Sequence, residues 1–147
     1  MLLLSIRPEY VEKIFNGEKQ VELRRRRPRV HPGDWIAIYS STPHKMLIGV
    51  VQIKAVMVAP PSRLWHSVKA VACLKRSAFL SYFDGSSQAV GIAIENPIRL
   101  PDPVSLDELR HAWPGFQPPQ EFRYLTEKQI DFVVQQLGQD ERHRVAA

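Results

Sequence analysis

Strand patterns and helix patterns follow one another irregularly along the 147-residue chain, and this order limits the folds open to it. Five segments have the apolar or alternating composition of strands: residues 2–6, 20–26, 34–41, 46–58 and 88–94. Helices are expected to begin at Pro8, Ser62, Ser77, Ser105 and Thr126. Because no regular strand–helix–strand repeat occurs, the pattern predicts an α+β fold, most simply a small curled or barrel-like sheet with helices around it.

The second half of the chain has clear helix starts and one clear break. Ser105 with Glu108, and Thr126 with Gln129, have the spacing of reciprocal capping boxes. Three prolines lie within residues 113–119, so this segment is expected to form a rigid loop. With 44% apolar residues the chain can bury a core, so we predict a single domain over residues 1–137. Residues 138–147 are polar and are expected to form a frayed tail.

Composition gives expectations about the cellular compartment, the cofactors and the membrane segments of the protein. The single Cys73 can form no internal disulfide, which fits a reducing, cytoplasmic compartment. No cysteine or histidine spacing indicates a metal site, so no metal or other cofactor is expected. The apolar start is cut off by Arg7 and no apolar run reaches about 18 residues, so no signal sequence or membrane span is predicted. The oligomeric state stays open.

Residues 17–28 concentrate charge directly behind the first expected helix. Strand alternation places Glu22, Arg24 and Arg26 on one face and Val21 with Leu23 on the core face. Lys19 follows a glycine, so its direction is not set by alternation and it can join Glu22 and Arg24. Two interpretations remain open: a surface ion pair on a half-exposed strand, or a site for an anionic ligand.

The four consecutive arginines at 24–27 bear on that choice. Like charges on both faces of one strand end repel one another, and an anion would relieve this repulsion. Arginine also binds phosphates in bidentate fashion and stacks on bases. Together with the net charge of +5, this favours a nucleic-acid ligand that contacts Arg25 and Arg26. The alternative is a solvated charge run that only keeps the protein soluble.

Two further groups are candidates for contact with a nucleic acid. Tyr39, Ser40 and Ser41 end an apolar strand, where their hydroxyl groups either bind a phosphate or base edge or simply satisfy the strand end. Arg123 and Tyr124 pair a cation with an aromatic ring, a combination that stacks single-stranded bases. Phe116 and Phe122 are expected to anchor the proline-rich loop in the core. No nucleophile–base spacing or glycine-rich phosphate loop is present in the sequence.

A short pattern in the first half of the chain resembles the signature of the ASCH domain family, which belongs to the PUA-like superfamily. It consists of L-S-I-R-P-E-Y at residues 4–10 followed by G-x-K-x-x-E-x-R at residues 17–24. The segments P-G-D at 32–34, G-F-Q-P-P-Q at 115–120 and F-R-Y-L at 122–125 extend the likeness. The resemblance implies a small mixed β-barrel with flanking helices, and a cleft beside the first helix into which the motif residues point.

The resemblance also implies a connection to RNA. Similar family members include a ribonuclease that acts on single-stranded RNA and an amidohydrolase that acts on acetylated cytidine. The matched positions make Lys19, Glu22 and Arg24 the candidate catalytic residues. In the amidohydrolase group the position of Glu22 is a threonine nucleophile, and a carboxylate does not perform that role in the same way. The remaining candidates for RNA binding are Arg7, Tyr10, Arg25, Arg26, Tyr39, Ser40, Ser41, Arg123 and Tyr124.

Three functions therefore follow as hypotheses. The first is binding of single-stranded RNA in a basic cleft, with metal-independent ribonuclease activity. The second is amidohydrolysis of a modified nucleoside such as acetylated cytidine. The third is a non-catalytic module whose basic face binds another protein. In the first, Lys19 either stays protonated and stabilises phosphate charge or, with a lowered pKa, acts as a general base.

Overall fold

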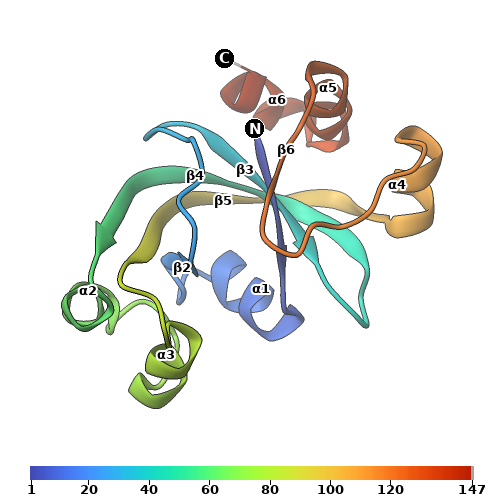
Figure 1. Ribbon diagram of the computed structural model, residues 1–147. Coiled ribbons are helices and arrows are strands. Elements are labelled where there is room, and N and C mark those ends of the chain that lie inside the picture. The colour runs from blue at the N-terminus through green and yellow to red at the C-terminus, as the bar shows by residue number, and fades with distance from the viewer. Residues whose placement is uncertain (147) are drawn as a thin grey trace.

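A computed structural model describes residues 1–146 of the chain. Six strands form one sheet in the spatial order β2-β5-β4-β3-β1-β6, and the sheet curls into an open half-barrel (Figure 1). The strands are β1 (Leu2–Ile6), β2 (Val21–Arg24), β3 (Trp35–Ser40), β4 (Met46–Ala59), β5 (Ala89–Ser105) and β6 (Arg123–Tyr124). The paired strands run antiparallel except β1 and β3, which are parallel.

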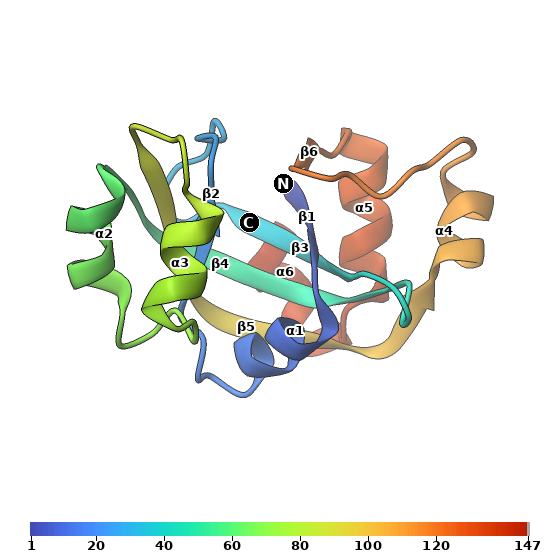
Figure 2. The ribbon, with the colours of Figure 1, turned by 60° about the horizontal axis from the view of Figure 1, so that its bottom comes forward.

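Helices surround this sheet on several sides, which confirms the predicted α+β fold. They are α1 (Pro8–Phe15), α2 (Pro61–Val68), α3 (Arg76–Tyr82), α4 (Leu106–Ala112), α5 (Glu127–Gln136) and α6 (Gln139–Ala146). Figure 1 shows α1 on one face of the sheet and α5 with α6 on the other. In Figure 2, α2 and α3 lie at one end of the sheet and α4 at the other, with α3 next to β2.

Alternation along the strands divides the core between the two faces of the sheet. Leu2 and Leu4 pack with the apolar side of α1, whereas Leu3 packs in the cluster that includes residues of α4, α5 and α6. Val21 and Leu23 belong to a third buried cluster, formed with α2 and α3. The prediction that Val21 and Leu23 face the core is confirmed.

Several boundaries differ from the expected ones. β2 ends at Arg24, so Arg26 is not on the strand and does not share its face with Glu22. β5 continues to Ser105 instead of stopping at Ile94. Its prolines are tolerated because β2 pairs with β5 only from Val90 to Ala93, which leaves the later edge of β5 without a partner strand. α2 begins at Pro61 and its N-terminus has no side-chain cap, so the predicted start at Ser62 is wrong by one residue.

The C-terminal segment is more ordered than predicted. Both capping boxes are present, and residues 113–119 form neither helix nor strand, as expected. A frayed tail over residues 138–147 is wrong for residues 139–146, which form α6. Val145 is buried in the core, and Arg142 donates hydrogen bonds to the carbonyl oxygens of Gln135 and Leu137. These contacts hold α6 against α5; Ala147 lies outside the described residues.

Candidate functional site

The turn after α1 directs the side chain of Lys19 into the protein. Gly17 has a φ of 87°, a left-handed conformation that glycine adopts easily and that ends the helix. The backbone N–H of Lys19 then donates to the Lys13 carbonyl at 2.9 Å, and that of Gln20 donates to the Val71 carbonyl at 2.9 Å. With the backbone held on both sides, Lys19 is only 2% exposed.

The buried ammonium of Lys19 has few partners. Nζ donates a hydrogen bond to the Ala72 carbonyl at 2.5 Å and lies 5.0 Å from the centre of the Tyr10 ring. Burial lowers the pKa of Lys19, and although Glu22 acts in the opposite direction, the pKa stays below its ordinary value. A larger fraction of Lys19 is therefore neutral near physiological pH than for a lysine in water.

Glu22 and Arg24 lie beside Lys19 and are themselves largely buried. Glu22 Oε1 accepts a hydrogen bond from the Leu23 backbone N–H at 2.9 Å, and Oε2 lies 3.6 Å from Arg24 Nη2. Arg24 also donates from Nη2 to the Ser5 carbonyl at 3.2 Å and from Nη1 to the Glu121 carbonyl at 2.9 Å. β1 has no partner on this side beyond Leu3, so Arg24 connects β2 with the free edge of β1.

These side chains line a cavity of about 460 Å³, here named the Lys19 pocket. This volume falls within the range of small-molecule sites. Five of the predicted site residues meet in it: Arg7, Tyr10, Lys19, Glu22 and Arg24. Its other lining residues are Ser5, Ile6, Leu23, Leu74, Ala78, Ser81 and Tyr82. The pocket borders α1 through Tyr10, on the side where the family resemblance implies a cleft.

The wall that α3 contributes was not predicted. Ala78, Ser81 and Tyr82 lie on one face of this helix, and Leu74 precedes it on the same side. The Tyr82 hydroxyl donates to the Leu23 carbonyl at 3.3 Å, which ties α3 to β2. The available signal was the small residues at helical spacing next to an aromatic residue, but such a face usually packs in a core.

Arg25 and Arg26 lie just outside the Lys19 pocket, in the bend after β2. With Arg24, Tyr82, Gln120, Glu121 and Phe122 they line a smaller hollow of about 70 Å³, the arginine depression. Arg26 forms an ion pair with Glu121 at 2.8 Å. Arg25 donates from Nε to the Tyr82 carbonyl at 2.7 Å, and no carboxylate within residues 1–146 lies within 4.0 Å of its guanidinium. Within the described residues, carboxylates thus neutralise only part of the positive charge of residues 24–27.

The residues at the end of β3 lie outside the Lys19 pocket. Tyr39 and Ser40 are buried, and Ser40 Oγ lies 3.2 Å from His44 Nδ1. Tyr39 and Ser41 contribute instead to a separate hollow of about 350 Å³, the Lys45 depression. Its other lining residues are Ser5, Thr42, Lys45, Leu106, Pro118, Pro119 and Gln120.

Arg123 and Tyr124 are also outside the Lys19 pocket. Both are exposed on β6. The Tyr124 hydroxyl accepts a hydrogen bond from the Arg29 backbone N–H at 2.7 Å, and the Arg123 guanidinium lies 5.6 Å from the centre of the Phe116 ring. Phe116 is buried and Phe122 half-buried, as expected for residues that anchor this loop.

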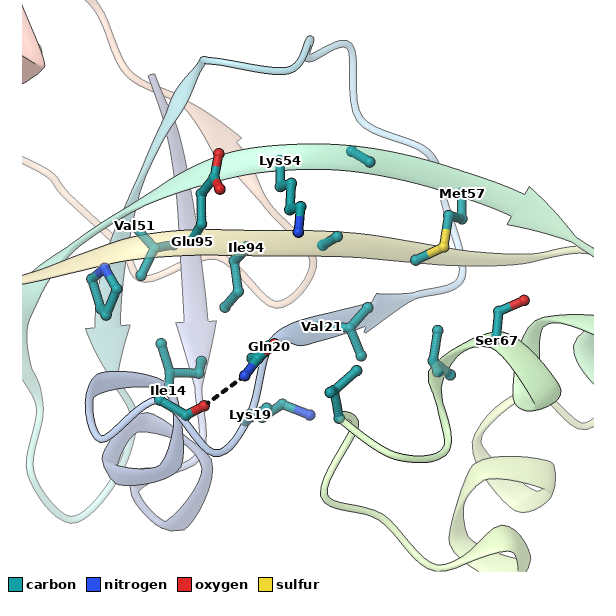
Figure 3. A pocket seen from close by; sticks show the side chains of 16 residues that line it. Ile14, Lys19, Gln20, Val21, Val51, Lys54, Met57, Ser67, Ile94 and Glu95 are labelled. Atoms are coloured by element: carbon teal, nitrogen blue, oxygen red, sulfur yellow. Dashed lines mark hydrogen bonds between the residues drawn. The ribbon is translucent and has the colours of Figure 1, made fainter.

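Lys19 also borders a second cavity, of about 440 Å³, shown in Figure 3. The figure places Lys19 at one edge and, across the cavity, Lys54 on β4 and Glu95 on β5. Most of its other walls are apolar, including Ile14, Val21 and Met57. No arginine lines this cavity, whereas Arg7 and Arg24 line the Lys19 pocket, so the Lys19 pocket has the better donors for a phosphate.

Within residues 1–146, no three His, Cys, Asp or Glu side chains are grouped so that they could hold a metal ion. No helix in this part of the chain has both the length and the apolar character needed to cross a membrane.

Comparison with known proteins shows which family this chain resembles. The sequence model of the ASCH domain matches residues 4–98, which contain every residue that lines the Lys19 pocket. A curated relative, an ASCH domain-containing ribonuclease of Zymomonas mobilis subsp. mobilis, is 31% identical over 141 residues. The alignment covers 95% of this chain and 93% of the relative.

Solved structures also include ASCH proteins that are similar to this chain. The crystal structure of ASCH from Zymomonas mobilis matches with a TM-score of 0.84 and 30% identity, over 91% of this chain and 93% of that one. The N-terminal domain of Staphylothermus marinus McrB, with a TM-score of 0.56 and 10% identity, is similar in fold alone. The expected PUA-like α+β fold is therefore confirmed, and the chain belongs to the ASCH domain family.

Proposed function

We propose that this ASCH protein binds single-stranded RNA in the Lys19 pocket and cleaves it without a metal ion. One observation carries the proposal: a buried lysine, a buried carboxylate and a largely buried arginine line one pocket, directly beside the exposed Arg25. The likeness to the Zymomonas mobilis ribonuclease over nearly the whole chain supports it.

The shape of the pocket favours a single strand over a duplex. A base that has left the stack can enter a cavity of this size and contact the rings of Tyr10 and Tyr82, which both line it. In a duplex the same base is paired and stacked, so it is not available. Arg25 lies at the border of the pocket, where the phosphate of an inserted nucleotide would follow its base.

The buried amine fits an intramolecular cleavage of RNA. The ribose 2′-hydroxyl attacks the adjacent phosphorus, the bond to the 5′-oxygen breaks, and a 2′,3′-cyclic phosphate and a 5′-hydroxyl result. Neutral Lys19, favoured by its lowered pKa, accepts the 2′-hydroxyl proton and returns it to the departing 5′-oxygen. Arg24 stabilises the charge that develops on the phosphate oxygens, and Glu22 holds the Arg24 guanidinium in place. No step requires a metal, because the substrate supplies the nucleophile.

The test is an incubation of EDTA-treated protein with single-stranded RNA, with analysis of the product ends. We expect 2′,3′-cyclic phosphate ends, loss of cleavage in Lys19→Ala, and no cleavage of a strand whose 2′-hydroxyl groups are all methylated. Lys69→Ala is the matched control, because Lys69 is exposed and lines neither the Lys19 pocket nor the depressions beside it. Activity that Lys19→Ala leaves intact in a folded protein would refute the catalytic part of the proposal.

A second candidate is amidohydrolysis of acetylated cytidine. The volume of the Lys19 pocket, about 460 Å³, also suits a single nucleoside and favours this alternative. Glu22 weighs against it, because its Oε1 already accepts a hydrogen bond from Leu23 and its Oε2 faces Arg24. Adding acetylated cytidine to the same incubation decides between the two: release of acetate would select the amidohydrolase. RNA binding with neither RNA cleavage nor acetate release would leave RNA binding without catalysis, and failure to bind RNA would favour the module whose basic face binds another protein.

A further inference from the structure

Three hollows adjoin one another on the surface around the Lys19 pocket. Ser5 lines both the Lys19 pocket and the Lys45 depression. Arg24 and Tyr82 line both the Lys19 pocket and the arginine depression. Gln120 lines the arginine depression and the Lys45 depression. A ligand that fills the Lys19 pocket therefore has two further hollows within immediate reach.

The polar atoms at these borders are not fully used by the protein. Ser5 Oγ and Arg24 Nε are buried and have no hydrogen-bond partner within residues 1–146. Buried polar atoms in folded proteins are nearly always paired with protein, water or a ligand, so both atoms are available to accept or donate a hydrogen bond to a ligand at these borders. Both residues lie where two hollows meet, which is where a ligand crossing from one to the other would pass.

The three hollows differ in size and in chemistry. The Lys19 pocket and the Lys45 depression, at about 460 and 350 Å³, are each large enough for a base. The arginine depression, at about 70 Å³, is too small for a base, but its guanidinium groups suit a phosphate. In the Lys45 depression, Pro118 and Pro119 provide apolar surface and Lys45 an exposed ammonium group.

We propose, on the basis of the function proposed above, that the site binds two adjacent nucleotides and a flanking phosphate. One base occupies the Lys19 pocket, its neighbour occupies the Lys45 depression with Lys45 on the backbone phosphate, and a further phosphate lies in the arginine depression. The ligand is thus an RNA strand rather than a single nucleoside. Lys45, which the sequence did not single out, contributes to the recognition of its length.

Binding of short oligonucleotides of increasing length tests this. The probes are 2′-O-methyl oligouridylates from one nucleotide to four, which cannot be cleaved by attack of a 2′-hydroxyl. For the wild-type protein we expect affinity to rise steeply between one and two nucleotides. Lys45→Asn is the informative variant, since Lys45 has a φ of 50° and asparagine accepts this conformation. The control is Lys69→Asn, which removes an exposed lysine away from all three hollows.

We expect Lys45→Asn, but not Lys69→Asn, to weaken the binding of probes longer than one nucleotide. Lys45→Asn should bind the dinucleotide and longer probes about three- to tenfold more weakly, as expected for one lost hydrogen bond, with unchanged affinity for the mononucleotide. The slope of log affinity against log salt should fall by roughly 0.7 for the longer probes. Equal losses in Lys45→Asn and Lys69→Asn, or a mononucleotide that binds as tightly as the dinucleotide, would overturn the inference. If the wild-type protein binds no long single strand at all, the proposed function itself is wrong.

Discussion

Arg24 donates a hydrogen bond from Nη2 to the backbone carbonyl of Ser5 at 3.2 Å, and so joins β2 to the free edge of β1. The same guanidinium faces Glu22 at 3.6 Å and lines the Lys19 pocket. Arg24 thus connects two strands that are not neighbours in the sheet, and it also lines the candidate site. The structural role of Arg24 and its proposed role in binding are therefore coupled.

Replacing Arg24 with alanine should destabilise the fold. The change removes the hydrogen bonds to the Ser5 and Glu121 carbonyls and leaves Glu22, which is 9% exposed, without its cation. We expect a loss of about 3–5 kcal/mol, the usual cost of breaking a buried ion pair from one side. Urea denaturation measures it. Arg26→Ala is the control, because its ion pair with Glu121 is exposed and should contribute less than about 1 kcal/mol. Similar small losses in both variants would mean that Arg24 does not hold the strands together.

The buried Lys19 predicts a pH-dependent stability. Its pKa is lower in the folded protein than in the unfolded chain, so between these two values the unfolded chain binds more protons. The contribution of Lys19 to the free energy of unfolding therefore increases as pH rises through this window. Lys19→Met lacks this contribution. Urea midpoints measured from pH 7 to pH 10 should show the wild-type protein gaining stability relative to Lys19→Met. Parallel pH profiles would contradict the lowered pKa.

Leu23 tests the orientation of β2. Its side chain is 5% exposed and packs with α2 and α3, opposite the face that carries Glu22 and Arg24. Leu23→Ala should cost about 2–5 kcal/mol through lost burial and the cavity left behind. A thermal melt that this substitution leaves unchanged would reject the orientation of the strand and, with it, the geometry of the site.

Glu121 should limit the affinity for RNA. Its carboxylate neutralises Arg26 at 2.8 Å in the arginine depression and would repel a phosphate there. Glu121→Gln should strengthen binding of single-stranded RNA and steepen the salt dependence by roughly 0.7 if Arg26 then contacts one phosphate. Glu12→Gln is a matched control, since Glu12 pairs with Arg99 at 3.0 Å outside the three hollows. Weaker binding in Glu121→Gln would show that this carboxylate orders the site instead of opposing the ligand.

Part of this site could be predicted because the information is local. A glycine after a helix and a strand with one apolar face are enough to bring Lys19, Glu22 and Arg24 together. A slip of one residue would turn the charged side chains into the apolar cluster of α2 and α3 and remove Val21 and Leu23 from it. The roles of these residues in binding and catalysis stay predictions, as do those of Arg123 and Tyr124.

The rest depends on contacts between distant segments. Tyr82 reaches the pocket only because α3 packs against β2, and Ser5 borders it only because β6 covers no more than the first residues of β1. The predicted end of β5 at Ile94 is wrong for a similar reason. Prolines normally indicate the end of a strand, and only the tertiary structure shows that the later edge of β5 has no partner strand and tolerates them. α6 is polar, and the burial of Val145 that holds it is a tertiary contact.

The charges beside the Lys19 pocket should bind a single RNA strand, and filter binding across several salt concentrations tests this most directly. Single-stranded RNA should outcompete duplex DNA, and Arg25→Ala should reduce the slope of log affinity against log salt by roughly 0.7, the value for one phosphate contact. Lys19→Ala and Arg24→Ala should weaken binding further, with circular dichroism confirming that each variant is folded. If Arg25→Ala and Arg24→Ala leave both the affinity and the salt slope unchanged, these arginines do not bind the RNA. If binding is lost only in Arg123→Ala and Tyr124→Ala, the RNA site lies on β6.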